Sequence, residues 1–177
     1  MPYPPSDNPD PLGISLPGVP KDFATADEGD RARTDRGFAA ELIMGRLVPF
    51  NGFVGLEFRE VTAKHVQLEL PHRPEHIGDP TRPALHGGAL AMLADTAGGT
   101  LVLAATESGD KVSTLDMRID YLRPADLETT FADATLVRLG RRAAVVRIHV
   151  WQPNHTEPDG KRHIADSTAV YSVYRAE

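Results

Sequence analysis

The chain has 177 residues, of which 41% are hydrophobic and 25% are charged, and its formal net charge is −6. This length suits one domain with a sizeable core, and the acidic balance argues against nucleic acid or an anionic membrane as the main partner. The absence of cysteine excludes disulfides, thiolate metal sites and a cysteine nucleophile. Residues 1–20 show no apolar leader, which predicts a cytoplasmic protein.

The N-terminal part of the chain divides into an arm and a helix. Residues 1–25 are predicted to be a Pro-rich extended or disordered arm, because seven of the fifteen prolines fall in the first 20 positions. Residues 26–177 are predicted to form a single domain. Its first element is a helix over 26–48, where apolar residues recur near helical spacing, and Pro49 is expected to end it.

The rest of the chain combines strand patterns with one long apolar helix. A loop rich in Pro and His over 71–85 leads into a central helix expected at about 87–106. That helix is apolar on nearly all sides, so a sheet must wrap it, which predicts an α+β fold. Six segments show the alternation or β-branched runs of strands, the last four as a meander: 53–60, 64–70, 112–122, 127–138, 142–151 and 163–174.

The central segment "LHGGALAMLADTAGGTLVL" combines two unusual features. Gly87 and Gly88 open the helix, where unpaired N–H groups and a partial positive charge favour an oxyanion. Asp95 places one carboxylate among apolar residues, and an unpaired buried carboxylate costs several kcal/mol. Asp95 is therefore either hydrogen-bonded to a neighbouring element or acts as a general base or nucleophile in a partly dry site.

The spacing of these two features bears on how a site could form. His86 and Asp95 are nine residues apart, which corresponds to roughly 13 Å along a helix axis. One helix cannot hold a small reacting centre against both its start and Asp95. If the two features cooperate, they must come from different copies of the chain, and a two-fold dimer would bring the helix start of one chain to Asp95 of the other and form two equivalent sites.

Three motifs carry a resemblance to a known family: His86-Gly87-Gly88, "LADTA" over 93–97 and "VSTLDMRIDYLRPA" over 112–125. Together they resemble the hotdog-fold acyl-CoA thioesterases of the PaaI type, over about residues 50–175. In that family an antiparallel sheet of about six strands wraps a long central helix, and dimers join their sheets edge to edge, often pairing into tetramers. The resemblance implies a homo-oligomer, either a dimer or a dimer of dimers, that hydrolyses an acyl-CoA thioester.

The resemblance also implies a role for each matching residue. The Gly87 N–H would polarise the thioester carbonyl, with His86 shaping the turn and Gly88 contacting the substrate. Asp95 from the other subunit would act as the general base on water, or as the nucleophile. Thr114, in the following strand, would help to position the water.

Two details qualify this correspondence. By strict alternation, Thr114 is expected on the strand face opposite Leu115 and Met117. Many relatives carry an Asn about six residues before the histidine of the motif, and this chain has Pro80 there. Side-chain help from that loop would have to come from another residue, such as Asp79.

Basic residues are expected where the phosphates of coenzyme A bind. Arg123 at a strand end and the turn pair Arg141 and Arg142 are the candidates, because arginine suits phosphate. The alternative for each is a solvated turn residue. His72 and His76 have metal-ligand spacing, but prolines in that segment disfavour a helical ligand pair, so no metal is predicted. No cofactor is expected either, with coenzyme A only part of the substrate and water the co-substrate.

The predicted function is therefore hydrolysis of an acyl-CoA thioester to free acid and CoA. The alternatives are a non-catalytic acyl-CoA-binding module, a hotdog acyl-thioester hydratase or dehydratase, and a structural or regulatory oligomer. Aryl, short-chain and medium-chain acyl groups all remain open, as does a carrier-protein thioester in place of CoA. No nucleic-acid or membrane partner is expected.

Overall fold

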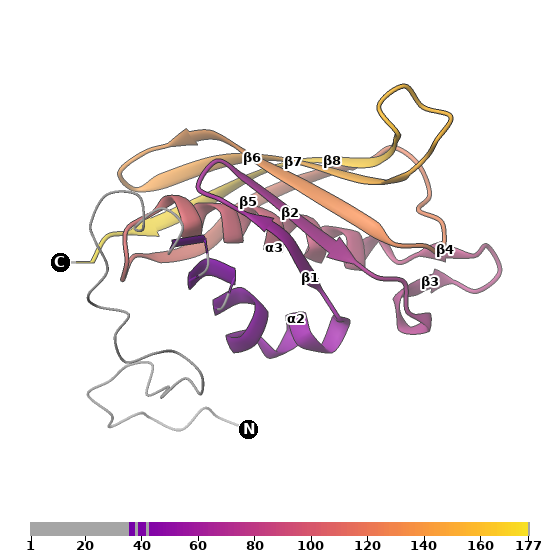
Figure 1. The fold of residues 1–177 in the computed structure, drawn as a ribbon, viewed down its shortest axis with the longest axis horizontal. Coiled ribbons are helices and arrows are strands. Elements are labelled where there is room, and N and C mark those ends of the chain that lie inside the picture. Colours follow the sequence, from indigo (N-terminus) through magenta and orange to yellow (C-terminus); the bar gives the residue numbers. More distant parts are fainter. Residues whose placement is uncertain (1–35, 38, 42, 177) are drawn as a thin grey trace.

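The computed structural model describes residues 36–37, 39–41 and 43–176 (Figure 1). The predicted Pro-rich arm, residues 1–25, and most of the predicted helix over 26–48 lie outside the described residues. Within them, one long helix and one large antiparallel sheet make up the body of the molecule.

The long helix, α3 (Gly87–Ala105), lies along one face of the sheet (Figure 1). It is rich in small residues, so the strands can approach its axis closely, and Leu93, Ala97 and Leu101 are completely buried against them. The helix contacts β2, β5, β6, β7 and β8. The predicted α+β fold, with a sheet of six strands on one central helix, is confirmed.

The order of the strands differs in one respect from the predicted meander. Strands β6, β7 and β8 do follow one another in the sheet, but β5 pairs with β8 and not with β6. Alternation locates strands in a sequence without identifying their neighbours. The spatial order is β1 (Glu57–Val61), β2 (His65–Leu70), β6 (Thr130–Leu139), β7 (Ala143–Pro153), β8 (Lys161–Tyr174) and β5 (Lys111–Tyr121).

The segment before β1 also departs from the prediction. A π-helical turn, η1 (Ile43–Leu47), is followed by a short helix, α2 (Pro49–Val54). The helical residues before it end at Leu47, just before Pro49 as expected, but Pro49 also begins a second helix, because the first helical position needs no N–H donor. Gly55, with φ of 73°, ends it in the left-handed conformation that favours glycine. The first predicted strand, 53–60, therefore begins later, at Glu57.

The predicted loop over 71–85 contains structure that orients α3. A short 3₁₀ turn, η2 (Pro74–His76), and a small hairpin of β3 (Ile77–Asp79) and β4 (Ala84–Leu85) lie within it. The His86 N–H donates to the His76 carbonyl over 2.7 Å, and the Leu85 N–H donates to the Ala125 carbonyl over 3.0 Å. These two bonds fix the residue at which α3 begins.

By length and composition alone, α3 could cross a membrane, since its mean hydropathy reaches 1.4 over an 18-residue window. In this fold, 56% of that window is buried inside the domain. The core helix of a globular domain meets the same criteria, so this indication of a membrane span is weak.

Candidate functional site

Asp95 lies halfway along α3 and faces the strands β5 and β8. Its Oδ1 accepts a hydrogen bond from the Thr114 hydroxyl on β5, over 2.9 Å. The Tyr171 hydroxyl on β8 is 3.3 Å from the same oxygen and 3.0 Å from the Asp95 main-chain carbonyl. Two hydroxyl groups therefore hold the Asp95 carboxylate. Because Asp95 is only half-buried, part of the residue remains accessible to solvent.

A bulge in β5 explains how Thr114 reaches Asp95. Thr114 pairs with Tyr171 and Asp116 with Val170, so Leu115 is an extra residue in the strand. Leu115 points outward and is 62% exposed. Thr114 and Met117 therefore share the face that packs on α3, and the predicted placement of Thr114 on the opposite face from Met117 is wrong.

Tyr171 is a site residue that the sequence analysis missed. Its ring is buried. The hydroxyl uses the space that a side chain at Gly98 would need, because a Cβ on Gly98 would lie only 2.2 Å from the hydroxyl oxygen. Burial, together with the negative charge of Asp95, raises the pKa of Tyr171 well above its usual value. The hydroxyl therefore stays protonated and donates to Asp95. A signal was present in the sequence, because a tyrosine in a buried strand needs a partner for its hydroxyl.

Asp95 opens onto a cavity of about 400 Å³, called here the Asp95 cavity. Its walls come from η1, α2, α3, β5 and β8, and they are mostly apolar. A neighbouring cavity of about 460 Å³, the Phe53 cavity, lies between α2 and the start of α3. Phe50 and Met92 line both cavities, so these two side chains stand between them.

The start of α3 forms a second polar feature. His86 is the N-cap, and its Nδ1 accepts a hydrogen bond from the Gly88 N–H over 2.8 Å. Gly87 is the first helical residue, so no carbonyl within the helix can accept its N–H. Of the two predicted glycines, Gly88 has its N–H occupied by the cap, whereas the Gly87 N–H has no acceptor in the helix.

The predicted phosphate-binding arginines lie at opposite ends of the sheet. Arg123 lines a cavity of about 290 Å³ together with Gly87 and Tyr121, and it donates to the His163 carbonyl. Arg141 and Arg142 are exposed in the turn between β6 and β7, at the end of the sheet where β5 begins. A single chain does not bring the two groups together.

The loop that departs from the family pattern does not supply a substitute for the missing Asn. Asp79 accepts hydrogen bonds from the side chain and main chain of Thr81 and pairs with Arg82. The Thr81 hydroxyl is the main cause that lowers the pKa of Asp79 to about 2. Asp79 thus stabilises its own turn, away from Asp95.

Comparison with known proteins identifies the class. The thioesterase superfamily model matches residues 83–158. The medium/long-chain acyl-CoA thioesterase YigI of Escherichia coli K12 is 33% identical over 139 residues, covering 71% of this chain and 86% of the relative. A solved thioesterase from Haemophilus influenzae is 25% identical, with a TM-score of 0.62, over 71% of this chain and 82% of that one. The E. coli PaaI protein from the phenylacetic acid degradation operon shares the fold, at 17% identity and a TM-score of 0.68, over 80% and 96% of the two chains.

The helix wrapped by a sheet, with a carboxylate facing the edge strand, is thus the scaffold of a hotdog-fold thioester hydrolase. The chain belongs to the thioesterase superfamily, and the resemblance drawn from its sequence is confirmed.

Proposed function

We propose that this protein hydrolyses acyl-CoA thioesters, with Asp95 of one subunit acting on water and Gly87 of the other polarising the thioester carbonyl. One observation carries the proposal: two hydroxyl groups hold the Asp95 carboxylate at the wall of an apolar cavity, directly behind the edge strand β5. A carboxylate held in this way is oriented to take a proton from a water molecule.

The edge strand β5 provides the surface for pairing. It has 11 residues and, within the part of the chain that the structure describes, a single neighbour, β8; exposed apolar side chains such as Leu115 lie on it. Such an open edge invites a second strand. Thr114 touches Asp95 near one end of β5, and Tyr121 donates to the Gly87 carbonyl over 2.8 Å at the other end.

These two contacts define a register for the dimer. If two copies of β5 pair antiparallel about Arg118, with Leu115 left out of the pairing as the bulge residue, Thr114 of each chain lies opposite Tyr121 of the other. Asp95 would then approach the helix start of the second chain, forming two equivalent sites. The same pairing would carry Arg123 of one chain toward Arg141 and Arg142 of the other, where the phosphates of CoA would bind. A dimer of dimers is compatible with this pairing.

The reaction consumes one water and needs no cofactor or metal at this site. Asp95 takes a proton as the water oxygen attacks the carbonyl carbon, and the Gly87 N–H stabilises the oxyanion. The C–S bond breaks as the intermediate collapses, and the proton passes to the departing thiolate. We propose the base and not the nucleophile, and a single turnover in H₂¹⁸O tests this choice. A base can place ¹⁸O only in the product acid, whereas ¹⁸O in Asp95 would show that an acyl-Asp95 anhydride had formed and that water had attacked its Asp95 carbonyl.

We further propose a medium or long acyl chain, in a cytoplasmic enzyme. The name of the E. coli relative describes a thioesterase for medium- and long-chain acyl-CoA. Support from this chain is the size and apolar lining of the Asp95 cavity and the Phe53 cavity, about 400 and 460 Å³, separated by Phe50 and Met92. Methionine is flexible enough to move aside for a longer chain.

The first test is thiol release from acetyl-, octanoyl-, palmitoyl- and phenylacetyl-CoA, with wild type and Asp95→Asn compared directly. We expect release to be fastest with the longer aliphatic chains and to fall by a factor of about 10² or more in the variant. Thermal unfolding of Asp95→Asn at the wild-type temperature would show that the fold is intact. Tight binding without release would indicate a binding module instead, and an enoyl thioester product would indicate a hydratase or dehydratase.

A further inference from the structure

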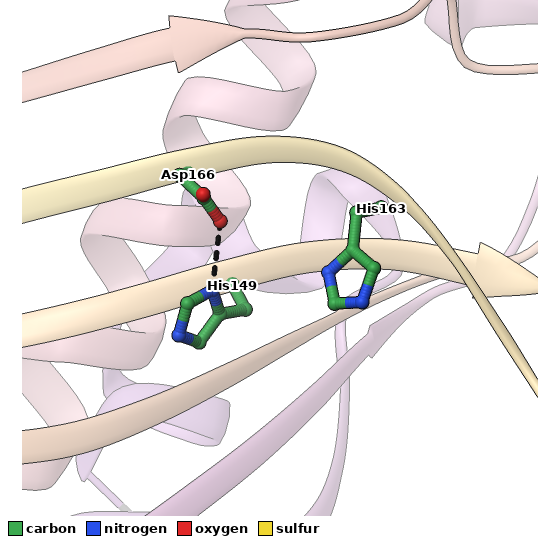
Figure 2. A group of neighbouring side chains, drawn as sticks. All are labelled: His149, His163 and Asp166. Atoms are coloured by element: carbon green, nitrogen blue, oxygen red, sulfur yellow. Dashed lines mark hydrogen bonds and ion pairs between the residues drawn. The ribbon is translucent and has the colours of Figure 1, made fainter. Parts of the chain in front are cut away.

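A cluster of two histidines and an aspartate lies on the other face of the sheet, away from α3. It consists of His149 on β7 and His163 and Asp166 on β8 (Figure 2). His149 and Asp166 are directly opposite each other in the sheet, with Nδ1 and Oδ1 2.7 Å apart. One ligand atom from each of the three residues lies within 4.8 Å of the others.

The strand pattern separates this cluster from the Asp95 site. Ile148 and Val150, on either side of His149, are completely buried in the core, so His149 points to the opposite face. In Figure 2 the side chains of the cluster extend from strands that lie between them and the helix. A ligand bound at the cluster would therefore not touch Asp95.

A bulge brings the two residues of β8 to the same face. His163 and Asp166 are three residues apart and would lie on opposite faces of a regular strand. The pairing shifts between Val150 and Trp151, which leaves Ile164 as an extra residue in β8. Bulges of this kind re-aim side chains, and here the bulge places His163 beside His149, with ring centroids 6.3 Å apart.

A second carboxylate orients one of the rings. Asp159, in the loop between β7 and β8, lies 3.1 Å from Nε2 of His163, which leaves Nδ1 of that ring for the cluster. A carboxylate behind the ring is the usual outer partner of a metal-binding histidine, because it fixes the tautomer and makes the ring more basic. The cluster thus has three ligand side chains and one supporting side chain.

We propose that His149, His163 and Asp166 bind one divalent first-row transition ion such as Zn²⁺, with water completing the coordination. Two imidazoles and one carboxylate suit Zn²⁺, Co²⁺ or Ni²⁺, whereas Ca²⁺ and Mg²⁺ prefer oxygen ligands throughout. The ion would replace the proton that His149 shares with Asp166. It would tie β7 to β8 beside the loop over 154–160, so its role is to stabilise this hairpin.

The test measures metal binding to the untagged full-length protein after treatment with a chelator. Zn²⁺ is titrated by calorimetry and Co²⁺ by its visible absorption, for wild type, His163→Ala, Asp166→Asn and the control His155→Ala. His155 is an exposed histidine in the same loop region and is not part of the cluster. We expect one ion per chain, affinity at least about tenfold weaker in both cluster variants, and no change in the control.

Two further readouts separate this proposal from the proposed function. Zn²⁺ should raise the melting temperature of wild type and of His155→Ala, but not that of a His149→Ala, His163→Ala double variant. Thiol release by His149→Ala should equal that of wild type. Equal Zn²⁺ affinity in wild type and the double variant, or no saturable binding at all, would overturn the metal site whatever the protein hydrolyses.

Discussion

Gly98 and Tyr171 fit together across the interface between α3 and β8. A Cβ at Gly98 would stand 2.2 Å from the Tyr171 hydroxyl and 2.9 Å from the ring carbon that carries it. The missing side chain lets the hydroxyl reach the carbonyl and carboxylate of Asp95. The absence of a side chain at Gly98 therefore helps to hold the candidate base, Asp95, in place.

Two neighbouring glycines allow a matched test of this fit. Gly98→Ala should destabilise the fold by about 1–3 kcal/mol through overpacking and should lower thiol release, because Tyr171 must move. At Gly99 the added Cβ would meet Tyr171 at 3.6 Å, an ordinary contact. Gly99→Ala should therefore stabilise the helix by up to about 1 kcal/mol. Urea unfolding of the two variants measures both changes in the free energy of unfolding. Equal changes in Gly98→Ala and Gly99→Ala would contradict the close fit between Gly98 and Tyr171.

Removing only the hydroxyl of Tyr171 isolates its contact with Asp95. Tyr171→Phe should lower kcat about tenfold with little change in KM, because the bound substrate does not depend on this hydroxyl while the orientation of the base does. Steady-state kinetics with the best acyl-CoA substrate measures kcat and KM separately. A change confined to KM would assign Tyr171 to substrate binding instead.

The raised pKa of Tyr171 gives a pH dependence with a definite sign. An unfolded tyrosine loses its proton near pH 10, whereas the buried hydroxyl beside Asp95 keeps it. Above about pH 10 the native state therefore binds more protons than the unfolded state, so stability falls as pH rises. This alkaline loss should be smaller in Tyr171→Phe than in wild type. Parallel curves of unfolding free energy against pH for the two proteins would be inconsistent with it.

Gly87 permits the removal of one N–H with little other change. Proline is favoured at the first helical position, and His86 already has the extended conformation that a residue before proline adopts. Gly87→Pro should lower kcat by a factor of about 10² to 10³, the usual loss of one oxyanion donor. Gly87→Ala keeps the N–H, and its Cβ meets Tyr121 at an ordinary 3.4 Å, so it should stay active. Equal rates in the two variants would exclude Gly87 as the donor.

Phe50 tests the proposed acyl site. It lines both the Asp95 cavity and the Phe53 cavity, whereas Phe53 lines only the second. Phe50→Ala should join the cavities and raise kcat/KM for palmitoyl-CoA relative to octanoyl-CoA by about tenfold. Phe53→Ala should change this ratio less. An unchanged ratio in Phe50→Ala would place the acyl chain elsewhere.

The residues of the site could be predicted from sequence to different degrees. The Gly pair and Asp95 stand out because their residue types are unusual in an apolar helix. The face of Thr114 was mispredicted because the bulge at Leu115 leaves no mark in the alternation. Tyr171 lies 76 positions from Asp95, and only the pairing of β8 with β5 brings the two together.

The same reasoning applies to the fold. The apolar helix and the strands were predictable from their periodicity, which is local. The place of β5 at the sheet edge depends on contacts between distant segments, and the proposed pairing of two chains rests on this feature. The walls that α2 and η1 contribute to the Asp95 cavity were missed for the same reason.

Complementation between two inactive variants tests most directly whether the site is shared by two chains. Asp95→Asn and Gly87→Pro are co-expressed with different tags, and the mixed dimers are compared with each variant alone. If Asp95 of one chain works with Gly87 of the other, each mixed dimer regains one of its two sites, and an equimolar mixture should show about a quarter of the wild-type rate. If both groups act within one chain, every site keeps a defect. Purified mixed dimers as inactive as the two parent variants would contradict the shared site.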